Sequence, residues 1–536
     1  MQTRLINDPE HAFARRWLTL LVLCISLTVI GLDNTILNVA IPTLARQLHA
    51  STSQLQWIVD AYTIVFAGLL LTAGSLGDRF GRYRMLALGL TIFGTGSAFS
   101  AFSGSATMLI VTRAFMGIGG AFIMPSTLSI LTNVFTNPVE RGKAIGIWAG
   151  VSALGIGLGP VTGGFLLSHF WWGSVFLVNI PIVMVGLIGG WFLVPDSRDP
   201  SAPRLDPVGA LLSIAGLSSL LYGVIEAPSH GWTSQSTVAA FVVGIGVLSV
   251  FMLWELRSSH PMLDLRFFQN PRFTAASGAI TMTFFTMFGT LFLLTQYLQS
   301  VLGFSALKAG ATFIPQACVM LVVAPSSSGL VRRFGNKLVV TFGMSMVALT
   351  LVLFSQLGVH ASFWQVIAVT CLLGVGMGNV MAPATDSIMG SLPREKAGVG
   401  SAVNDTTRQT GGAVGVAVFG SVLSSVYASH VLSAARAQHL PAAITSVVKT
   451  NVGQAAAYAA SHQSGPLGRA ALAIARNSYV TALHTAVLVG AGLLALGALA
   501  VARWLPARPA DEPAVIRQPV EEFESEPAAA FALEVG

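Results

Sequence analysis

The stretch Gly74-Ser75-Leu76-Gly77-Asp78-Arg79-Phe80-Gly81-Arg82-Tyr83-Arg84 separates two runs of almost purely apolar sequence. It concentrates charge in a chain of 536 residues that is only 10% charged. Its three glycines permit close packing and positive φ angles. This contrast predicts a tight turn that lies outside the hydrocarbon of a membrane. A simpler interpretation, a basic stop signal that only fixes the topology, stays open on this stretch alone.

Apolar runs recur on both sides of this turn, from residue 17 to residue 503. Each is long enough to cross a hydrocarbon core of about 30 Å, which takes about 20 residues. With 53% apolar residues and a mean hydropathy of +0.72, the chain is predicted to be an all-α polytopic membrane protein. We place fourteen spans at about 17–41, 54–77, 85–103, 106–130, 142–167, 173–194, 207–226, 236–255, 272–300, 306–330, 337–357, 362–391, 398–427 and 479–503.

The basic residues indicate the orientation. Most of the 29 Lys and Arg fall in short loops on the side that carries both ends of the chain. Loops rich in these residues stay in the cytoplasm. We therefore expect a multi-pass protein of the cell membrane with both termini cytoplasmic. The same loops, facing an anionic inner leaflet, account for the net charge of +7 without nucleic acid.

Two segments stand apart from the spans. Residues 428–478 form a long, Ala-rich connection on the outer side, which we expect to be partly helical along the membrane surface. Residues 505–536 are rich in Pro, Ala and Glu, which is typical of a disordered cytoplasmic tail.

A weak internal repeat is visible: residues 329–337 resemble residues 74–82 but lack the acid. Such a repeat indicates a duplicated bundle with a substrate path between its halves.

Charged residues inside spans are functional candidates, because each costs at least about 2.5 kcal/mol at the bilayer centre. Asp33 lies in the first predicted span, Asp60 in the second and Arg113 in the fourth. A helix rise of about 1.5 Å per residue puts all three at a similar depth in the outer half. A buried carboxyl with a movable arginine beside it can take up and release a proton. Two alternatives stay open: Asp33 and Arg113 could form a permanent structural pair, and Asp60 could lie near the outer headgroups.

The fifth predicted span carries a dense run of small residues. Glycines at steps of four and five residues make a smooth face that a neighbouring helix can approach closely, and a proline bends the helix. Generic helix packing produces single pairs of small residues, so this density favours a specific role. The residues concerned are Gly155, Gly159, Pro160, Gly163 and Gly164.

Other polar and aromatic residues are candidates for a substrate path. Asp405 and Arg408 are three residues apart on one helix face, which favours a local neutralising pair over direct substrate binding. Asp386 could line the way in or reach headgroup water. Phe284 and Phe288 could form an apolar binding wall or face lipid. The remaining candidates are Asn34, Asn38 and Asn404.

These motifs resemble a known family. Residues 74–82 look like the loop signature of the major facilitator superfamily, and residues 113–125 and 150–164 resemble its span-four and antiporter span-five motifs. Residues 32–42 and 404–415 are similar to signatures of its fourteen-span drug:proton antiporter branch. The likeness covers nearly every span, and it leaves out the outer loop and the tail.

The resemblance implies rocker-switch alternating access between two six-helix bundles. Residues 1–194 and 272–504 would form the bundles, and residues 195–271 a two-helix insert. Asp33 becomes the proton-coupling acid and Arg113 its modulator. Asp78 would dock on free backbone N–H groups at the glycine-rich start of span thirteen, at Gly398, where the helix dipole is positive. The inner gate would contain Gly74, Asp78, Arg79, Gly81 and Arg82, and the glycine-rich span five would seal and pivot in the export direction.

We therefore predict a bacterial secondary exporter of lipophilic, often cationic drugs, driven by inward-moving protons and conferring antibiotic resistance. An endogenous lipid, peptide or metabolite as cargo is the alternative. A membrane enzyme or receptor is least favoured, because the 10 His and 3 Cys form no metal-binding or catalytic cluster. No phosphate-binding loop occurs, so we expect the proton gradient and no cofactor to supply the energy. The expected partners are the substrate, protons and the lipid bilayer, around a monomer with no metal.

Overall fold

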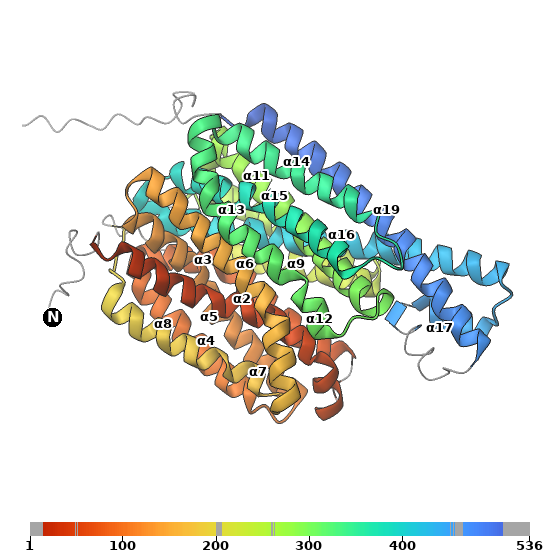
Figure 1. The fold of residues 1–536 in the computed structure, drawn as a ribbon. Helices are drawn as coiled ribbons and strands as arrows, with labels where there is room; N and C mark the ends of the chain where they lie inside the picture. Colours follow the sequence, from red (N-terminus) through yellow and green to blue (C-terminus); the bar gives the residue numbers. More distant parts are fainter. Residues whose placement is uncertain are drawn as a thin grey trace, which may run out of the picture.

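The structure is a computed structural model that describes residues 14–48, 50, 52–199, 206–258, 261, 263–450, 452–453, 455 and 465–506. Regular structure in these ranges is helical throughout, as predicted (Figure 1). The longer helices are α2 (Arg16–Gln47), α3 (Thr52–Phe80), α4 (Arg82–Ala101), α5 (Ala106–Val134), α6 (Pro138–His169), α8 (Asn179–Leu193), α9 (Pro207–His230), α10 (Gln235–Arg257), α11 (Pro271–Gln296), α13 (Phe313–Phe334), α14 (Asn336–Phe354), α15 (Phe363–Gly390), α16 (Ala397–Ala437) and α19 (Pro466–Trp504). The shorter ones include α7 (Ser174–Leu177), α12 (Ala306–Ala311) and α17 (Ala442–Thr450).

Each predicted span has a helical counterpart in the described part of the chain. Of the helical segments described, 13 are long and apolar enough to cross a membrane. The helix α4 is not among them, although it lies where the third span is predicted. The all-α polytopic fold class is therefore confirmed.

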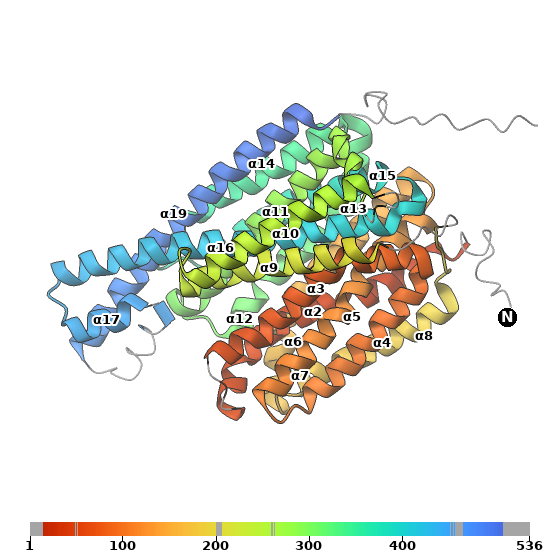
Figure 2. The same ribbon diagram turned by 180° about the vertical axis from the view of Figure 1, so that it is seen from behind.

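The helices pack as two groups. In the first, α5 packs against α3 and α4, and α2 against α6 and α8. In the second, α11 and α19 pack against α16, and α15 packs against α13 and α14. The groups meet where α6 lies against α13 and where α3 and α5 lie against α16. Figure 2 shows α9 and α10 along this seam, and α9 contacts both α3 and α16.

One end of the bundle carries both the start of α2 and the end of α19, and we call it the terminal end (Figure 1). At this end α3 continues to Phe80, three residues further than predicted, and α4 begins at Arg82. Gly81 alone separates them, with a φ of 112°, in the region that favours glycine. The turn is therefore tighter than the sequence suggests.

Much of the predicted outer loop continues two of the long helices. Helix α16 is 41 residues long and α19 is 39, and both continue past the ends of their neighbours rather than lying across the bundle (Figure 1). Buried Ile444 and Val448 of α17 pack into an apolar cluster with these extensions. The Tyr427 hydroxyl of α16 donates to the Val448 carbonyl over 2.7 Å. The connection is partly helical, as expected, and much of it continues α16 and α19, because the Ala-rich sequence favours helix. The predicted tail lies outside the described residues beyond Pro506.

Candidate functional site

A buried ion pair joins α2 to α5. Arg113 Nη1 donates to Asp33 Oδ2 over 2.5 Å, and the exposed fractions of the two side chains are 1% and 0%. Arg113 Nε also donates to the Ile58 carbonyl of α3 over 3.1 Å. Its guanidinium lies 4.4 Å from the centre of the Tyr62 ring, at cation–π distance. Helices α2, α3 and α5 are thus held together by one charged centre.

Asn179, at the start of α8, completes this centre. Its Nδ2 donates to Asp33 Oδ1 over 3.1 Å and to Ser97 Oγ over 3.0 Å. The Ser97 hydroxyl in turn donates to the Phe176 carbonyl over 2.8 Å. Both carboxylate oxygens of Asp33 therefore accept a hydrogen bond. Sequence reasoning missed Asn179, a buried amide at the break between α7 and α8, because it carries no charge that would mark it.

Three other predicted residues lie on the same helices, but the described structure gives none of them a hydrogen bond or ion pair with Asp33 or Arg113. Asp60 is half-buried on α3, two residues beyond the carbonyl that binds Arg113. Asn34 is half-buried on α2. Asn38 also lies on α2, but its side chain falls outside the described part of the structure.

A second charged centre joins the two groups at the terminal end. The Asp78 carboxylate accepts from the backbone N–H groups of Gly398, over 2.9 Å, and Val399, over 3.1 Å, at the start of α16. A helix N-terminus presents unpaired donors and a positive dipole end, so it binds a carboxylate well. The contact between Asp78 and the start of this helix is therefore present where the sequence analysis places it.

Arg82 strengthens this contact. Its Nη2 donates to Asp78 Oδ1 over 2.6 Å and to the Arg394 and Glu395 carbonyls over 3.0 and 2.9 Å. Arg79 instead is half-buried, with its guanidinium 5.6 Å from the Phe80 ring centre. The arginine that holds the acid is thus the one that starts α4.

The glycines of this turn have separate roles. A Cβ on Gly74 would lie 2.5 Å from the Gly398 carbonyl and 2.6 Å from Ala402 Cβ, so only glycine permits this approach of α3 to α16. Gly81 provides the positive φ. Gly77 does neither: its φ is not positive, and a Cβ at this position would have no neighbouring side chain or helix within 4 Å. Of the three glycines, Gly77 thus takes part in neither the close approach nor the turn.

A further ion pair crosses the seam at the same end. Arg141 Nε of α6 donates to Asp386 Oδ1 of α15 over 2.8 Å, with both side chains partly exposed. These residues line a cavity of about 670 Å³, together with Arg272, Arg332 and the buried Ser327. Asp386 therefore belongs to a contact between the two groups.

The glycine-rich helix α6 presents two faces. A Cβ on Gly155, Gly159 or Gly163 would meet α2, and at Gly159 it would touch the Thr35 side chain and lie 2.9 Å from the Ile36 nitrogen. Pro160 and Gly164 face the other way: a Cβ on Gly310 would lie 2.6 Å from Pro160 Cβ, and one on Gly164 would lie 3.7 Å from Leu307. One face thus locks α6 to α2, and the other meets α12 of the second group.

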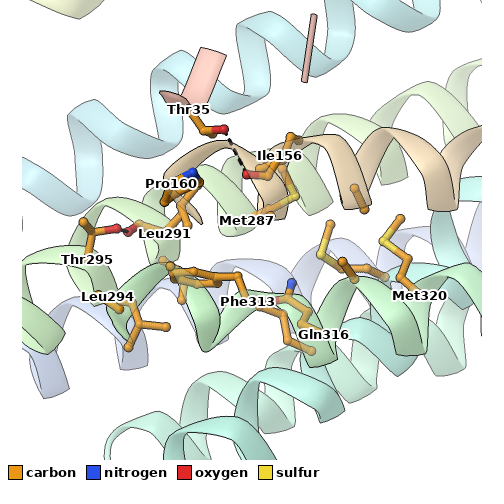
Figure 3. Close-up of a pocket in the computed structure, with 18 of the residues that line it drawn as sticks. Thr35, Ile156, Pro160, Met287, Leu291, Leu294, Thr295, Phe313, Gln316 and Met320 are labelled. Carbon is orange, nitrogen blue, oxygen red and sulfur yellow. Dashed lines mark hydrogen bonds between the residues drawn. The ribbon is translucent and has the colours of Figure 1, made fainter. Parts of the chain in front are cut away.

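A cavity of about 210 Å³ lies between the groups, away from the terminal end (Figure 3). Thr35 of α2 donates to the Ile156 carbonyl of α6 over 2.9 Å at its wall. Met287 and Leu294 of α11 face them. Most of the wall is apolar; the labelled lining residues are Thr35, Ile156, Pro160, Met287, Leu291, Leu294, Thr295, Phe313, Gln316 and Met320. A lipophilic molecule suits this lining.

The Asp405 and Arg408 side chains of α16 are fully buried but only loosely paired. Arg408 Nη1 lies 4.0 Å from Asp405 Oδ1, and Arg408 Nη2 donates instead to Thr385 Oγ1 over 3.1 Å. The guanidinium lies between two rings, 4.7 Å from Trp148 and 5.2 Å from Phe284. The predicted local pair is therefore present, at a long 4.0 Å, and the aromatic rings and Thr385 of α15 hold Arg408 as well.

The remaining candidates surround this buried pair. Buried Asn404 accepts from Thr385 Oγ1 over 3.3 Å and donates to Asp405 Oδ1 over 3.4 Å. Phe284 and Phe288 pack with each other at 6.0 Å, and a Cβ on Gly412 of α16 would lie 2.8 Å from Phe288. The aromatic side chains thus face α16, and Met287 between them lines the cavity. Among the residues described, no group of three or more His, Cys, Asp or Glu could hold a metal ion.

These features define a class: a polytopic membrane transporter whose two helical groups enclose a cavity and meet at a charged contact on one side. Residues 23–416 match the model of the Major Facilitator Superfamily, and the chain belongs to that family. It is 37% identical to the multidrug efflux pump LfrA of Mycolicibacterium smegmatis, over 83% of this chain and 88% of that protein. It is 34% identical to the methyl viologen resistance protein SmvA of Salmonella typhimurium, over 91% of this chain and 98% of that one.

The fold is shared with a solved structure. The proton:xylose symporter XylE, bound to 6-bromo-6-deoxy-D-glucose, matches with a TM-score of 0.57 over 92% of this chain and 96% of that chain. The sequence identity is 14%, so this likeness concerns the fold alone.

Proposed function

We propose that this chain exports lipophilic, often cationic small molecules across the cell membrane in exchange for protons. Both termini are cytoplasmic in this proposal, so the terminal end is the inner side. The names of the relatives support the cargo, since LfrA is named for multidrug efflux and SmvA for methyl viologen resistance. Arg82, Arg141 and Arg272 at the terminal end support the orientation, because basic residues favour the cytoplasmic side.

The observation that carries the proposal is the position of two residues on one turn of α2. Asp33 faces Arg113 inside the first group, and Thr35 faces α6 and lines the apolar cavity. A change of charge at Asp33 therefore acts on the helix that forms the cavity wall. Proton binding and substrate binding can be coupled over two residues.

In this proposal the structure corresponds to a step of the cycle in which the inner side is closed. Asp78, bound to the amides of Gly398 and Val399, closes the inner side. A proton taken up by Asp33 would neutralise the partner of Arg113 and loosen α2 from α5. The close contact of α2 with the glycines of α6 would pass this shift to the cavity. Release of the proton to the inside would restore the ion pair.

The energetics of the minimal exchange are simple. One monovalent cation leaving for one proton entering moves no net charge, so only the pH gradient drives it. That gradient is worth about 1.4 kcal/mol per pH unit.

Uptake of rhodamine 6G, a monovalent lipophilic dye, into inside-out vesicles with an acidic interior tests the proposal. We expect accumulation that a protonophore abolishes and that Asp33→Asn lacks. Asp264→Asn is the matched control, since Asp264 caps a short helix outside the bundle interior and Asn caps equally well. Uphill accumulation by folded Asp33→Asn would refute the coupling role. No accumulation by folded wild-type protein would refute the cationic cargo and favour an endogenous one.

A further inference from the structure

We propose that Asp405 is a second proton-binding site, in the second helical group, so that the protein exchanges two protons per cycle. The inference rests on the proposed function and goes beyond it by fixing the number of protons. It starts from a difference between two buried carboxyl groups. Asp33 accepts from Arg113 on one oxygen and from Asn179 on the other.

The Asp405 carboxyl has one hydrogen-bond donor where Asp33 has two. Its Oδ1 accepts from Asn404 over 3.4 Å, and its Oδ2 has no hydrogen-bond partner although the whole side chain is buried. A buried carboxylate oxygen without a donor is costly, because it loses its hydration without replacement. A proton can add to Oδ2 of Asp405 at an oxygen that accepts no hydrogen bond, whereas both oxygens of Asp33 already accept one. The geometry thus leaves a position open for a proton.

Among the described residues, one charged group acts on Asp405. Arg408, on the same helix, is the charged side chain that acts on it. The packed elements contribute neutral side chains here: Thr385 from α15, Trp148 from α6 and Phe284 from α11. The neighbouring charges on α3 and α5 are engaged elsewhere, since Asp78 binds the start of α16 and Arg113 binds Asp33.

Arg408 does not need Asp405 to stay where it is. The Trp148 and Phe284 rings and the Thr385 hydroxyl hold the guanidinium when the carboxyl is neutral. Trp148 belongs to the first group and is itself fixed by a hydrogen bond from Nε1 to Thr127 Oγ1. When Asp405 loses its proton, its charge would draw Arg408 away from Trp148, which weakens a contact between the two groups. The second proton therefore acts on the seam that the transport cycle has to open.

The charge balance provides the test. Two protons entering for one monovalent cation leaving move one net positive charge inward, so a potential positive on the receiving side drives export. About 100 mV is worth about 2.3 kcal/mol per elementary charge, or roughly fifty-fold in accumulation. One-for-one exchange has no such dependence.

We would measure rhodamine 6G accumulation in proteoliposomes with the pH gradient and the potential set independently. Wild type should respond to both, and folded Asp405→Asn should respond to the pH gradient alone. Asp264→Asn should behave as wild type. Potential-independent transport by wild type, or an unchanged potential response in Asp405→Asn, would overturn the inference while leaving the proposed function intact. If wild type fails to transport with either gradient applied, this would instead refute the proposed function, and the inference with it.

A second readout does not depend on transport. Infrared difference spectra of the purified protein between acidic and alkaline pH should contain a carboxylic acid C=O band that Asp405→Asn lacks and Asp33→Asn retains. A band unaffected by Asp405→Asn would overturn the inference even if that variant were inactive.

Discussion

Arg113 Nη1 and Asp33 Oδ2 lie 2.5 Å apart at a place where both side chains are almost completely buried. Removing one partner of such a pair leaves an uncompensated charge, which costs about 3–5 kcal/mol. A purely structural pair and a proton-coupling pair therefore make different predictions once stability and transport are measured separately.

We expect Asp33→Asn to lower the thermal stability of the purified protein and to abolish proton-driven transport. The double variant Asp33→Asn/Arg113→Gln removes both charges, so it should regain most of the stability and still fail to couple. Thermal unfolding in detergent and dye uptake would be measured on the same preparations. Recovery of proton-driven uptake in the double variant would identify the pair as structural.

Asp78→Ala should open the terminal end. The variant loses two hydrogen bonds to the start of α16 and the ion pair with Arg82, and hydrogen bonds to charged groups contribute about 1.5–3 kcal/mol each. We expect a membrane-impermeant thiol reagent to label Ser327→Cys, in a background without the native cysteines, at least about tenfold faster. Asp386→Ala removes a partly exposed pair, worth at most about 1 kcal/mol, and should accelerate labelling much less. Equal rates in the two variants would contradict the role of Asp78.

Two glycines of α6, two residues apart, should differ sharply when changed to alanine. A Cβ at Gly159 would touch Thr35 and lie 2.9 Å from the Ile36 nitrogen, whereas one at Gly157 would lie 3.6 Å from Ala317 Cβ, an ordinary contact. Gly159→Ala should therefore lose about 1–3 kcal/mol of stability and most transport. Gly157→Ala should retain both. Similar unfolding temperatures and uptake rates for the two variants would show that α2 and α6 are not locked together.

The turn between α3 and α4 offers another matched pair. Gly81→Ala forces a side chain into a φ of 112° and places a Cβ 2.6 Å from Asp196 Oδ1, so we expect a loss of about 1–2 kcal/mol. Gly77→Ala, inside helix α3 with open space around it, should raise stability by about 0.5–1 kcal/mol. Thermal unfolding of both variants would test this. A Gly81→Ala variant more stable than wild type would refute the strain expected for a side chain at this positive φ.

The sequence predicts the charged contacts well where an unpaired charge would carry a high free-energy cost. A buried charge in a span needs a partner, so Asp33 and Arg113 can be paired from depth alone. Asp78 can be paired with the start of α16 because a helix end always leaves donors free.

Neutral and long-range features escape the same reasoning. Asn179 carries no charge, so nothing in its apolar segment marks it as a ligand of Asp33. Arg408 has an acid three residues away, which predicts their local pair, but nothing in the sequence indicates that Trp148 and Phe284 also hold the guanidinium. The extension of α16 is not predicted, because the end of the span is placed from the thickness of the membrane, whereas the Ala-rich sequence beyond it continues the helix.

Helix α16 has a mechanical consequence for the whole molecule. Its first turn binds Asp78, its third and fourth turns carry Asp405 and Arg408, and its far part contacts α17 through Tyr427. At 1.5 Å per residue its 41 residues form a rod about 60 Å long, so a tilt of about 10° moves one end by about 10 Å relative to the other. A fluorophore on the exposed Ser446 of α17 would therefore report when the contact between Asp78 and the start of α16 opens at the opposite end of the protein.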